Sequence, residues 1–513
     1  MNRELLQAIG VDRLVPESLA RWRPLVCDGV LFFLGNLAPQ RRAEIMAAQL
    51  ALPADADPGQ RIIALLTQCP TLHKLGQVLA RNPSLPEALR LRLQALESMP
   101  ALTPMPVLLE HIRRELPADA ALTIADEALA EASVAAVVPF TWQEDGELRH
   151  GVFKVLKPGI EARLRDELAV WLELGTYLER RAGELGLPPL DYRDTLDSVA
   201  ELLANEVRVD NEQANLAAAA EFHAGSKDVV VPRLLRRWCT PRMTAMERVF
   251  GRKVTDAELA PQARARLADT AVTALLAEPF WSGDENVFFH ADPHAGNLLV
   301  TDDGRLAVID WALVARFSKH QREAIVDAVL GGLTLDADRV CRAVSSLGTL
   351  PPDHPVLREA VERGLQQVRQ FKLPGFGWLV ALLDEVASRT EAGFRKDLIL
   401  FRKLWATLSG VINDLAAEHR PDKALILSGL EHFVAELPGR YTAPFGSRAF
   451  DTHLSNADLL RLWATLGLVA ARYWRAGLGM MANTLKQSWS GSDARQDGRP
   501  ALPVGGPPRL AAA

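Results

Sequence analysis

Three polar side chains near the middle of the chain have the types and the spacing to hold a metal ion beside a reacting group. Asp292 is followed five positions later by Asn297 and eighteen positions later by Asp310. Carboxylate and amide oxygens are ligands for Mg²⁺, and a carboxylate can also accept a proton from a nucleophile. The stretch therefore predicts one proton acceptor and two metal ligands in a single site.

The residues that follow Asn297 predict a scaffold for these side chains. Residues 298–301 and 305–310 read as two short strands rich in β-branched and aliphatic residues. Residues 302–304, Asp-Asp-Gly, supply a turn whose Asp-Gly pair tolerates positive φ. A hairpin of this kind places Asn297 just before one strand and Asp310 at the end of the next. Both side chains are therefore expected at the same end of the hairpin.

Two other interpretations of the stretch remain open. The first is an ordinary surface hairpin that carries a few solvated acids. The second is a zinc site formed by His290, Asp292 and His294. Zinc usually takes three or four ligands of good geometry, and this run beside a proline supplies no obvious fourth ligand.

A phosphoryl-transfer site of the kinase type needs two further groups. A lysine on a strand holds the α and β phosphates of ATP, and an acid on a helix holds that lysine. Lys154 is the candidate lysine, because alternation along residues 152–156 gives Val152 and Lys154 one face of a strand and Phe153 and Val155 the other. A lysine within an apolar strand is costly without a partner.

The acid that pairs with Lys154 is either Glu206 or Glu212, both on a helix predicted from residue 195 to residue 216. At about 100° per residue, six positions turn a helix so far that the two side chains point in different directions. The two acids therefore have different roles, and a solvated helix face is the alternative for both.

Composition limits the classes of protein to consider. The chain has 513 residues, 48% of them hydrophobic and 24% charged, as in a globular protein of two or three domains. A net charge of −6 argues against a dedicated nucleic-acid binder, which would carry a basic excess. The four cysteines lie far apart, which argues against a disulfide framework and a thiolate metal site and fits a reducing cytoplasm: Cys27, Cys69, Cys239 and Cys341.

Targeting and membrane segments are not evident. An acid lies within the first residues and no long apolar run follows, so we expect no signal peptide. Residues 462–471 form the most apolar candidate segment, but Arg461 and Arg472 bound it well short of the roughly 20 residues that span a bilayer. This segment could lie on a membrane surface, against a partner helix or on the protein's own core.

Changes of pattern along the chain predict four segments. Residues 1–115 have helical periodicity and form an N-terminal helical extension, and residues 116–255 read as a lobe of mixed strands and helices. Within that lobe, residues 132–138 and 151–156 read as strands, and Pro139 suggests that the first of them is an edge strand or irregular. The remaining predicted segments are a helical lobe with the catalytic hairpin at 256–485 and a disordered tail at 486–513.

Several of these residues resemble a known family, the UbiB-like (AarF) atypical kinases of ubiquinone biosynthesis. The clearest match is His73-Lys74-Leu-Gly-Gln77, which is similar to the Lys-x-Gly-Gln signature of that family. The resemblance covers roughly residues 70 to 320 and is carried by the order of its elements. These are residues 73–83, the alanine-rich stretch 130–133, and residues 153–160, 206–215, 240–251 and 290–310.

The resemblance implies an α+β, protein-kinase-like fold of two lobes that binds ATP and Mg²⁺. It implies that Lys74, on the extension, reaches into the place that a protein substrate would need, and that Glu206 faces Lys74 while Glu212 pairs with Lys154. It also implies a kinase or ATPase for a lipid or isoprenoid small molecule. The implied site consists of catalytic Asp292, Lys154, Glu212 and Lys74, nucleotide-binding Lys154, Ala132, Ser133, Met246 and Glu247, and metal-binding Asn297 and Asp310.

The chain departs from the family pattern at several positions. Arg208 stands where a second acid is usual and could compete with Lys154 for Glu212. Asp310 is followed by Trp311 and Ala312 in place of Phe-Gly, and Ala adopts positive φ less readily than Gly. The family's membrane-spanning C-terminal hairpin is not visible, so any membrane contact would be peripheral, at the inner face of a membrane.

Three functions fit these residues. The first is an ATP-binding kinase or ATPase that supports quinone or isoprenoid lipid metabolism. The second is a small-molecule phosphotransferase similar to the aminoglycoside kinases, whose Asp-Trp after the hairpin resembles residues 310–311. The third is a nucleotide-binding scaffold with little catalysis, to which Arg208 and Ala312 would point.

Overall fold

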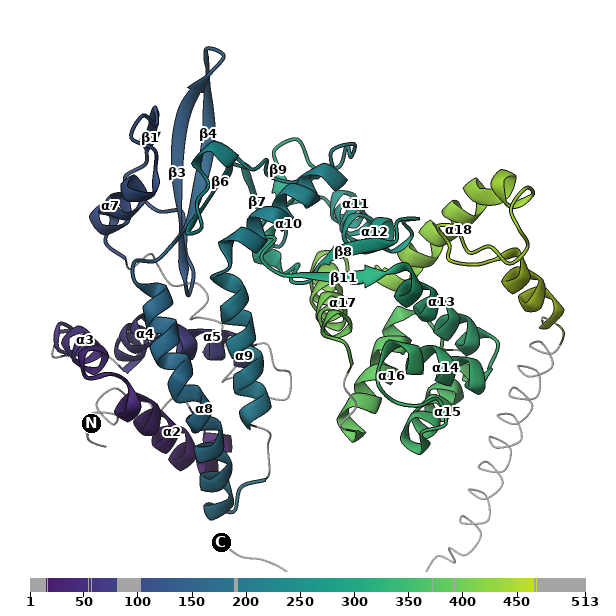
Figure 1. Ribbon diagram of the computed structural model, residues 1–513, viewed down its shortest axis with the longest axis horizontal. Helices are drawn as coiled ribbons and strands as arrows, with labels where there is room; N and C mark the ends of the chain where they lie inside the picture. Colours follow the sequence, from purple (N-terminus) through teal and green to yellow (C-terminus); the bar gives the residue numbers. More distant parts are fainter. Residues whose placement is uncertain are drawn as a thin grey trace, which may run out of the picture. The chain divides into compact units, whose positions relative to one another are not determined.

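The computed structural model describes residues 15, 17–53, 55–56, 58–80, 103–188, 192–370, 372–390, 394–465 and 467 (Figure 1). The chain forms two compact units. The first unit comprises Met1–Glu258 and Pro293–Val314, and the second comprises Leu259–Asp292 and Ala315–Ala513. These units divide the chain differently from the four predicted segments, because the hairpin after Asn297 packs with the first unit. The predicted tail at 486–513 lies outside the described residues.

The first unit contains an antiparallel sheet in the order β1-β3-β4-β6, with β2 also paired to β3. Its strands are β1 (Leu122–Ile124), β2 (Ala130–Glu131), β3 (Ala135–Glu144), β4 (Glu147–Leu156) and β6 (Met243–Glu247). β3 and β4 form a long hairpin. Asp145 and Gly146 in its turn both have positive φ, 54° and 81°, as a two-residue hairpin turn requires.

Pro139 predicted an edge or irregular strand; the edge position is wrong, and the irregularity is confirmed by a break in the pairing opposite Pro139. β3 pairs with β4 along one side and with β1 and β2 along the other. Pro139 lies between the two short strands, where its carbonyl accepts the N–H of Ala125 at 2.9 Å. No donor is required from residue 139 at that gap, and a proline is therefore tolerated within the sheet.

Aromatic side chains fill the core beneath this sheet. Phe140 and Phe153 stack with ring centroids 3.9 Å apart, and Trp142 and Trp238 meet edge to face at 5.3 Å. Gly151 is needed here, because a Cβ at that position would overlap the ring of Phe140. The packing fixes which face of β4 is apolar, and thus the side on which Lys154 lies.

Helices make up the rest of the first unit. They are η2 (Glu17–Trp22), α2 (Arg23–Asn36), α3 (Pro39–Leu50), α4 (Pro58–Gln68), α5 (Pro70–Ala80), α7 (Met105–Glu115), α8 (Ile160–Glu184), α9 (Tyr192–Glu206) and α10 (Val209–Phe222). α8 packs against α2, α5 and α9, and α5 also packs against α9. The single helix predicted for residues 195–216 is wrong, since Arg208 has φ −86° and ψ 71° and separates α9 from α10.

A second sheet of the first unit carries the predicted hairpin. Its strand order is β5-β10-β9-β7, with β5 (Val229–Val230), β7 (Gly251–Lys253), β9 (Leu298–Thr301) and β10 (Leu306–Val308). β9 and β10 are antiparallel, and Gly304 in their loop has φ 82°. The predicted hairpin is confirmed, although β10 ends two residues before Asp310. β5 and β7 pair with its outer sides.

The second unit is mostly helical. It contains α11 (Pro261–Val272), η5 (Thr273–Ala277), α12 (Glu278–Phe280), α13 (Lys319–Leu333), α14 (Ala337–Leu347), α15 (Pro355–Arg369), α16 (Phe376–Arg389), α17 (Lys396–Leu415) and α18 (Pro421–Arg440). The strands β8 (Asn286–His290) and β11 (Val314–Ser318) form a two-stranded sheet. Phe289, Phe317 and Phe401 pack together in its core, with centroids 4.9–5.4 Å apart.

Local capping explains where helices of the second unit begin. Ser318 and Gln321 form a reciprocal capping box at the start of α13. Asp336 accepts the N–H of Arg339 at 3.0 Å and caps α14. Pro355 and Pro421 occupy the first turn of α15 and α18, where a missing N–H costs nothing.

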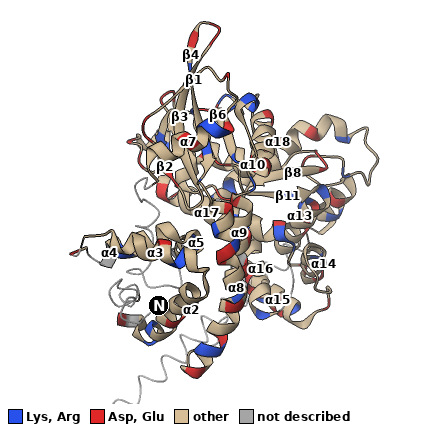
Figure 2. Cartoon of the chain, turned by 60° about the vertical axis from the view of Figure 1, so that its left-hand side comes forward, with Lys and Arg blue, Asp and Glu red and all other residues tan. Residues whose placement is uncertain are grey.

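Charged residues of both signs are interspersed along the helices and strands of each unit (Figure 2). This distribution accords with the net charge of −6. Single-sign surfaces favour nucleic-acid binding, whereas mixed charges favour solubility without such binding.

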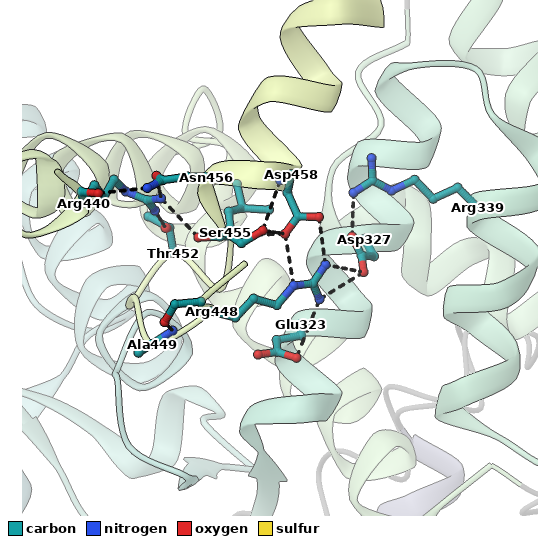
Figure 3. Close-up of polar contacts among 12 residues, drawn as sticks. Glu323, Asp327, Arg339, Arg440, Arg448, Ala449, Thr452, Ser455, Asn456 and Asp458 are labelled. Atoms are coloured by element: carbon teal, nitrogen blue, oxygen red, sulfur yellow. Dashed lines mark hydrogen bonds and ion pairs between the residues drawn. The ribbon is translucent and has the colours of Figure 1, made fainter. Parts of the chain in front are cut away.

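One guanidinium joins the segment after α18 to α13. Arg448 lies 3.0 Å from Asp458, 3.3 Å from Asp327 and 3.6 Å from Glu323 (Figure 3). Asp327 also pairs with Arg339 at 2.6 Å. Hydrogen bonds with Arg448 and Ser455 outweigh burial, which would raise the pKa of Asp458, and hold that pKa at about 2.

Arg448→Ala is expected to destabilise the second unit by about 2 kcal/mol, because three carboxylates would be left close together without their shared cation. Urea unfolding at neutral pH would measure the loss. Arg358→Ala is the matched control, since Arg358 forms an exposed ion pair with Asp338 at 2.8 Å. Equal unfolding midpoints for the two variants would show that the Arg448 network does not stabilise the fold.

Candidate active site

Lys154 lies on β4 with its ammonium between two carboxylates. Its Nζ is 2.7 Å from Oε1 of Glu212 and 3.0 Å from Oδ2 of Asp310. Phe153 and Val155 are fully buried on the opposite face, as the alternation predicted. The structure therefore selects Glu212 over Glu206 as the partner of Lys154.

The electrostatics of this group follow from one buried cation facing two anions. Burial alone would lower the pKa of Lys154, but the charges of Asp310 and Glu212 outweigh it and raise that pKa. Burial raises the pKa of Glu212, and the charge of Asp310 adds to this against the opposing effect of Lys154. The ammonium stays charged, and the surplus negative charge is available to a cation.

The break between α9 and α10 places Glu212. Its N–H bonds to the carbonyl of Arg208, so that Glu212 lies in the first turn of α10. The Arg208 side chain is exposed and contacts Asn211 at 3.2 Å and Asp210 at 3.8 Å. The prediction that Arg208 competes with Lys154 for Glu212 is therefore wrong. Arg208 precedes α10, so its side chain does not lie on the helix face that carries Glu212.

The hairpin brings Asn297 and the end of β10 together. The N–H of Ile309 donates to the carbonyl of Asn297 at 2.9 Å, which places Asp310 next to Asn297 in the fold. Asn297 is 9% exposed and ends a short 3₁₀ turn, Ala295–Asn297. Both predicted metal ligands thus lie at the same end of the hairpin.

Positive φ occurs at Asp310 and not at Ala312. Asp310 has φ 62°, and its Oδ1 accepts the N–H of Ala312 at 3.2 Å. Asp tolerates the left-handed region better than most residues because its short side chain can bond to nearby backbone. The concern that alanine is a poor replacement for glycine at position 312 is therefore not supported.

Asp292 ends the first of the two segments that make up the second unit and is described within that unit. Its Oδ2 lies 3.1 Å from Nζ of Lys403 on α17, and its N–H donates to Nδ1 of His290 at 3.2 Å. His294, in the first unit, accepts the N–H of Gly296 through Nδ1 at 3.0 Å. Within the described part of the chain, no three His, Cys, Asp or Glu side chains form a metal-binding group, so the zinc interpretation gains no support.

The extension contacts the predicted acidic residue. Lys74 on α5 forms a salt bridge with Oε1 of Glu206 at the end of α9. Oε2 of the same carboxylate accepts the hydroxyl of Ser133 at 3.0 Å. Lys74, the alanine-rich stretch and α9 are therefore tied together at Glu206.

The alanine-rich stretch is held from a second direction. Glu131 forms a buried ion pair with Lys157 at 2.6 Å and accepts the N–H and hydroxyl of Thr103, each at 2.9 Å. Burial would raise the pKa of Glu131, but these hydrogen bonds outweigh it and lower that pKa. Glu131, which interrupts the alanine run, thus serves to anchor it, while Ala132 is exposed and Ser133 is buried.

The predicted adenine-binding residues lie at the end of β6. Met246 is 7% exposed and pairs with Val152 of β4. The N–H of Glu247 donates to the carbonyl of Arg233 at 2.9 Å, and its carboxylate pairs with the Arg233 guanidinium. Met246 therefore lies on β6, the strand that pairs with the strand of Lys154.

Comparison with known proteins adds independent information. A family model described as "ABC1 atypical kinase-like domain" matches residues 109–344. Those residues, a little less than half of the chain, are similar to the ABC1 atypical kinase-like family. The resemblance to UbiB-like kinases is confirmed, and so is the α+β, kinase-like fold with a helical C-terminal part.

Two curated relatives and one solved structure are similar to this chain. A "Probable protein kinase UbiB" of Azotobacter vinelandii is 28% identical over 69% of this chain and 67% of that protein. The chloroplastic "Protein ACTIVITY OF BC1 COMPLEX KINASE 8" of Arabidopsis thaliana is 26% identical over 66% of this chain, but the match spans 44% of the plant protein. A solved Mycobacterium tuberculosis protein in complex with erythromycin aligns at 19% identity and a TM-score of 0.42, over 75% of this chain and 89% of that one.

Two side chains that the sequence did not single out contact residues of the candidate site. Asn215, three positions after Glu212, donates to the carbonyl of Trp311 at 3.1 Å and thereby holds the segment after Asp310. Lys403, the partner of Asp292, lies beyond the matched residues on α17. Asn215 could have been found from its spacing to Glu212, whereas no local signal points to Lys403.

Proposed function

We propose that this ABC1 protein is an atypical kinase or ATPase that binds magnesium ATP. The observation that carries the proposal is the group formed by Lys154, Glu212 and Asp310, in which a buried ammonium on a strand is held by an acid on a helix. Kinases use this arrangement to position the phosphates of ATP. A merely structural ion pair would need neither the second carboxylate nor Asn297 beside it.

The residues present fit a magnesium ion. Asn297 and Asp310 offer an amide and a carboxylate oxygen, and Mg²⁺ typically takes one or two protein ligands and completes its shell with water and phosphate oxygens. The surplus negative charge around Lys154 also favours a cation there. When bound, Mg²⁺ neutralises charge on the phosphates and orients them.

The other residues receive roles from their chemistry. Lys154 would hold the α and β phosphates, and Glu212 would keep its ammonium in place. Ala132 and Ser133 would border the nucleotide, as would Met246 and Glu247 at the adenine. Asp292 would accept the proton of the attacking hydroxyl or water, which is the step that a carboxylate can perform at neutral pH.

The extension points to the class of acceptor. Lys74 and Glu206 form a salt bridge with each other beside the alanine-rich stretch. This arrangement supports a small acceptor in preference to a protein segment. The proposal of a lipid or isoprenoid acceptor, and of a role in quinone metabolism, rests on the resemblance to UbiB-like kinases. Across the described residues, no helix has both the length and the apolar character needed to cross a membrane. We propose a peripheral membrane contact from the cytoplasmic side.

The scaffold alternative loses its two motivating observations. Arg208 contacts Asp210 and Asn211 and leaves Glu212 to Lys154. Ala312 has no positive φ, since that conformation falls on Asp310. Lys74 and its partner Glu206 likewise favour the UbiB-like function over an aminoglycoside-kinase-like one.

Incubation of the purified protein with Mg²⁺ and labelled ATP tests the proposal. Binding at millimolar nucleotide, followed by release of phosphate or labelling of an added isoprenoid or quinone precursor, is the expected result. An absence of magnesium-nucleotide binding at these concentrations would end the proposal. A lipid and metabolite profile of cells that lack the protein would then identify the pathway.

Lys74→Ala is expected to change nucleotide preference or to raise phosphorylation several-fold, because Glu206 and Ser133 would lose the cation that holds α5 near them. Labelling with ATP and GTP in parallel would measure the change. Glu206→Gln should produce the same change, since it breaks the same pair, and exposed Lys227→Ala should not. If Lys74→Ala and Lys227→Ala behave alike, the extension does not act on the site.

A further inference from the structure

The helix α18 turns an apolar face away from the second unit. Four of its large side chains, each 41–57% exposed, follow one another at intervals of three, four and three residues: Leu427, Leu430, Val434 and Leu437. Tyr441, directly after the helix and 92% exposed, continues this spacing. Side chains at such intervals share one helix face, which we call the outer face of α18. A surface helix normally packs its apolar face on the core of its own domain.

The opposite face of α18 carries polar groups that contact the unit. Glu436 and Arg440 pair at 2.7 Å, and their side chains are only 9% and 5% exposed. Glu436 also accepts the N–H and the hydroxyl of Thr452, each at 2.8 Å, and Arg440 donates to the same hydroxyl at 2.7 Å (Figure 3). His432 lies 3.4 Å from Asp451. The polar residues of this helix therefore face the protein, and its apolar residues face away.

Close packing fixes this rotation of α18. The indole N–H of Trp281 donates to the carbonyl of Leu425 at 3.0 Å, and the Leu425 side chain is fully buried. A Cβ at Gly429 would overlap the ring of Trp281. Turning the outer face inward would break these contacts and separate the buried charges of Glu436 and Arg440, which is costly. The exposed apolar face is therefore a property of the folded unit.

The spacing and charge of the outer face indicate what covers it. Apolar residues that alternate at three and four positions form the narrow line of contact between two paired helices. A lipid surface instead suits a helix whose polar side is rich in Lys and Arg. On α18 the exposed charged residues Lys423 and Glu431 have opposite signs. A second apolar helix therefore fits this face better than an anionic lipid surface does.

The area of the outer face is close to what a dimer needs. Together with the neighbouring Ile426, its side chains expose on the order of 600 Å², the upper end of the largest apolar patch on a typical monomer. A standard interface covers about 800 Å² on each partner, and the flanks of the helix would supply the remainder. Because the outer face is uncharged, the same face of a second copy can pack on it across a two-fold axis without opposing like charges.

We propose that the outer face of α18 is a dimerisation surface, on which the same face of a second copy of this chain packs. The surface lies within the second unit and includes none of the residues proposed to bind nucleotide. The proposal therefore goes beyond the proposed function and does not depend on it. The contact spans about two heptads, which is short, so we expect a dissociation constant in the micromolar range.

Sedimentation equilibrium of the full-length protein, between about 1 and 200 μM, tests the proposal. The mass of the wild type should rise from 56.2 kDa toward twice that value. The double variant Leu430→Glu with Val434→Glu should raise the dissociation constant at least about 100-fold, because each copy would bring two unpaired charges into the contact. The matched control is Leu373→Glu, a leucine outside α18 that is 56% exposed, and it should associate like the wild type.

The double variant Leu427→Ser with Leu437→Ser is a second test if the glutamates disturb folding, and it should weaken association at least about tenfold. A wild type that remains at 56.2 kDa at the highest concentration would overturn the proposal. If that monomer bound phosphatidylglycerol vesicles and the glutamate variant did not, the face would belong to a lipid surface. A dimer that both double variants retain would also overturn it. A dimer that both variants lose, in a protein without ATP turnover, would contradict the proposed function and leave the interface standing.

Discussion

Asp292→Asn is expected to reduce phosphoryl transfer by about 10³-fold while magnesium-nucleotide affinity stays within about twofold of the wild type. The amide has nearly the same shape as the carboxylate and can still accept a hydrogen bond from Lys403. It cannot take up the proton of the attacking hydroxyl. Turnover and equilibrium nucleotide binding, measured on the same preparations, separate the two effects.

The matched control for this variant is Asp353→Asn, an exposed aspartate of the second unit. It should change neither binding nor turnover. A thousandfold loss of nucleotide affinity in Asp292→Asn would mean that Asp292 holds the nucleotide and not the proton. Unchanged turnover would instead remove Asp292 from the chemistry altogether.

Asp310→Asn is expected to weaken magnesium-nucleotide binding by about 10- to 100-fold, because a neutral amide is a poorer ligand for a hard divalent cation. The change also removes one of the two charges that surround Lys154. Isothermal titration with Mg²⁺ and a non-hydrolysable ATP analogue would measure the loss. The same titration with the metal chelated should show a much smaller difference between variant and wild type.

Asp302→Asn lies in the loop of the same hairpin and is exposed, so it controls for a general effect on β9 and β10. Equal affinities for Asp310→Asn and Asp302→Asn would contradict the metal role of Asp310. Unchanged turnover in both Asp292→Asn and Asp310→Asn would favour a nucleotide-binding scaffold over an enzyme.

Much of the candidate site could be predicted because its parts are short and local. Alternation along residues 152–156 placed Lys154 opposite an apolar face, and the aromatic packing of Phe153 confirms it. The turn residues before Arg305 predicted the hairpin that carries Asn297 and Asp310. In each case the pattern spans fewer than about fifteen residues, a distance over which backbone preferences act directly.

Errors arose where a neighbouring element overrides the local pattern. Pro139 is typical of an edge or irregular strand, and only the gap that β1 and β2 leave opposite it shows that the strand lies within the sheet. Residues 195–216 have continuous helical character, yet the chain leaves the helix at Arg208. A propensity of a few tenths of a kcal/mol per residue, about what separates ordinary residues, is easily outweighed by packing.

The sequence by itself determined the types of group in the site, a lysine on a strand, acids on helices and two oxygen ligands at a hairpin, because these depend on residue identity and short-range periodicity. Only the tertiary structure decided which acid faces Lys154 and that Lys403 neutralises Asp292. These pairs join residues 58 and 111 positions apart. Folding of the buried core brings such residues together. No local pattern in the sequence indicates which distant charged or polar groups will pair.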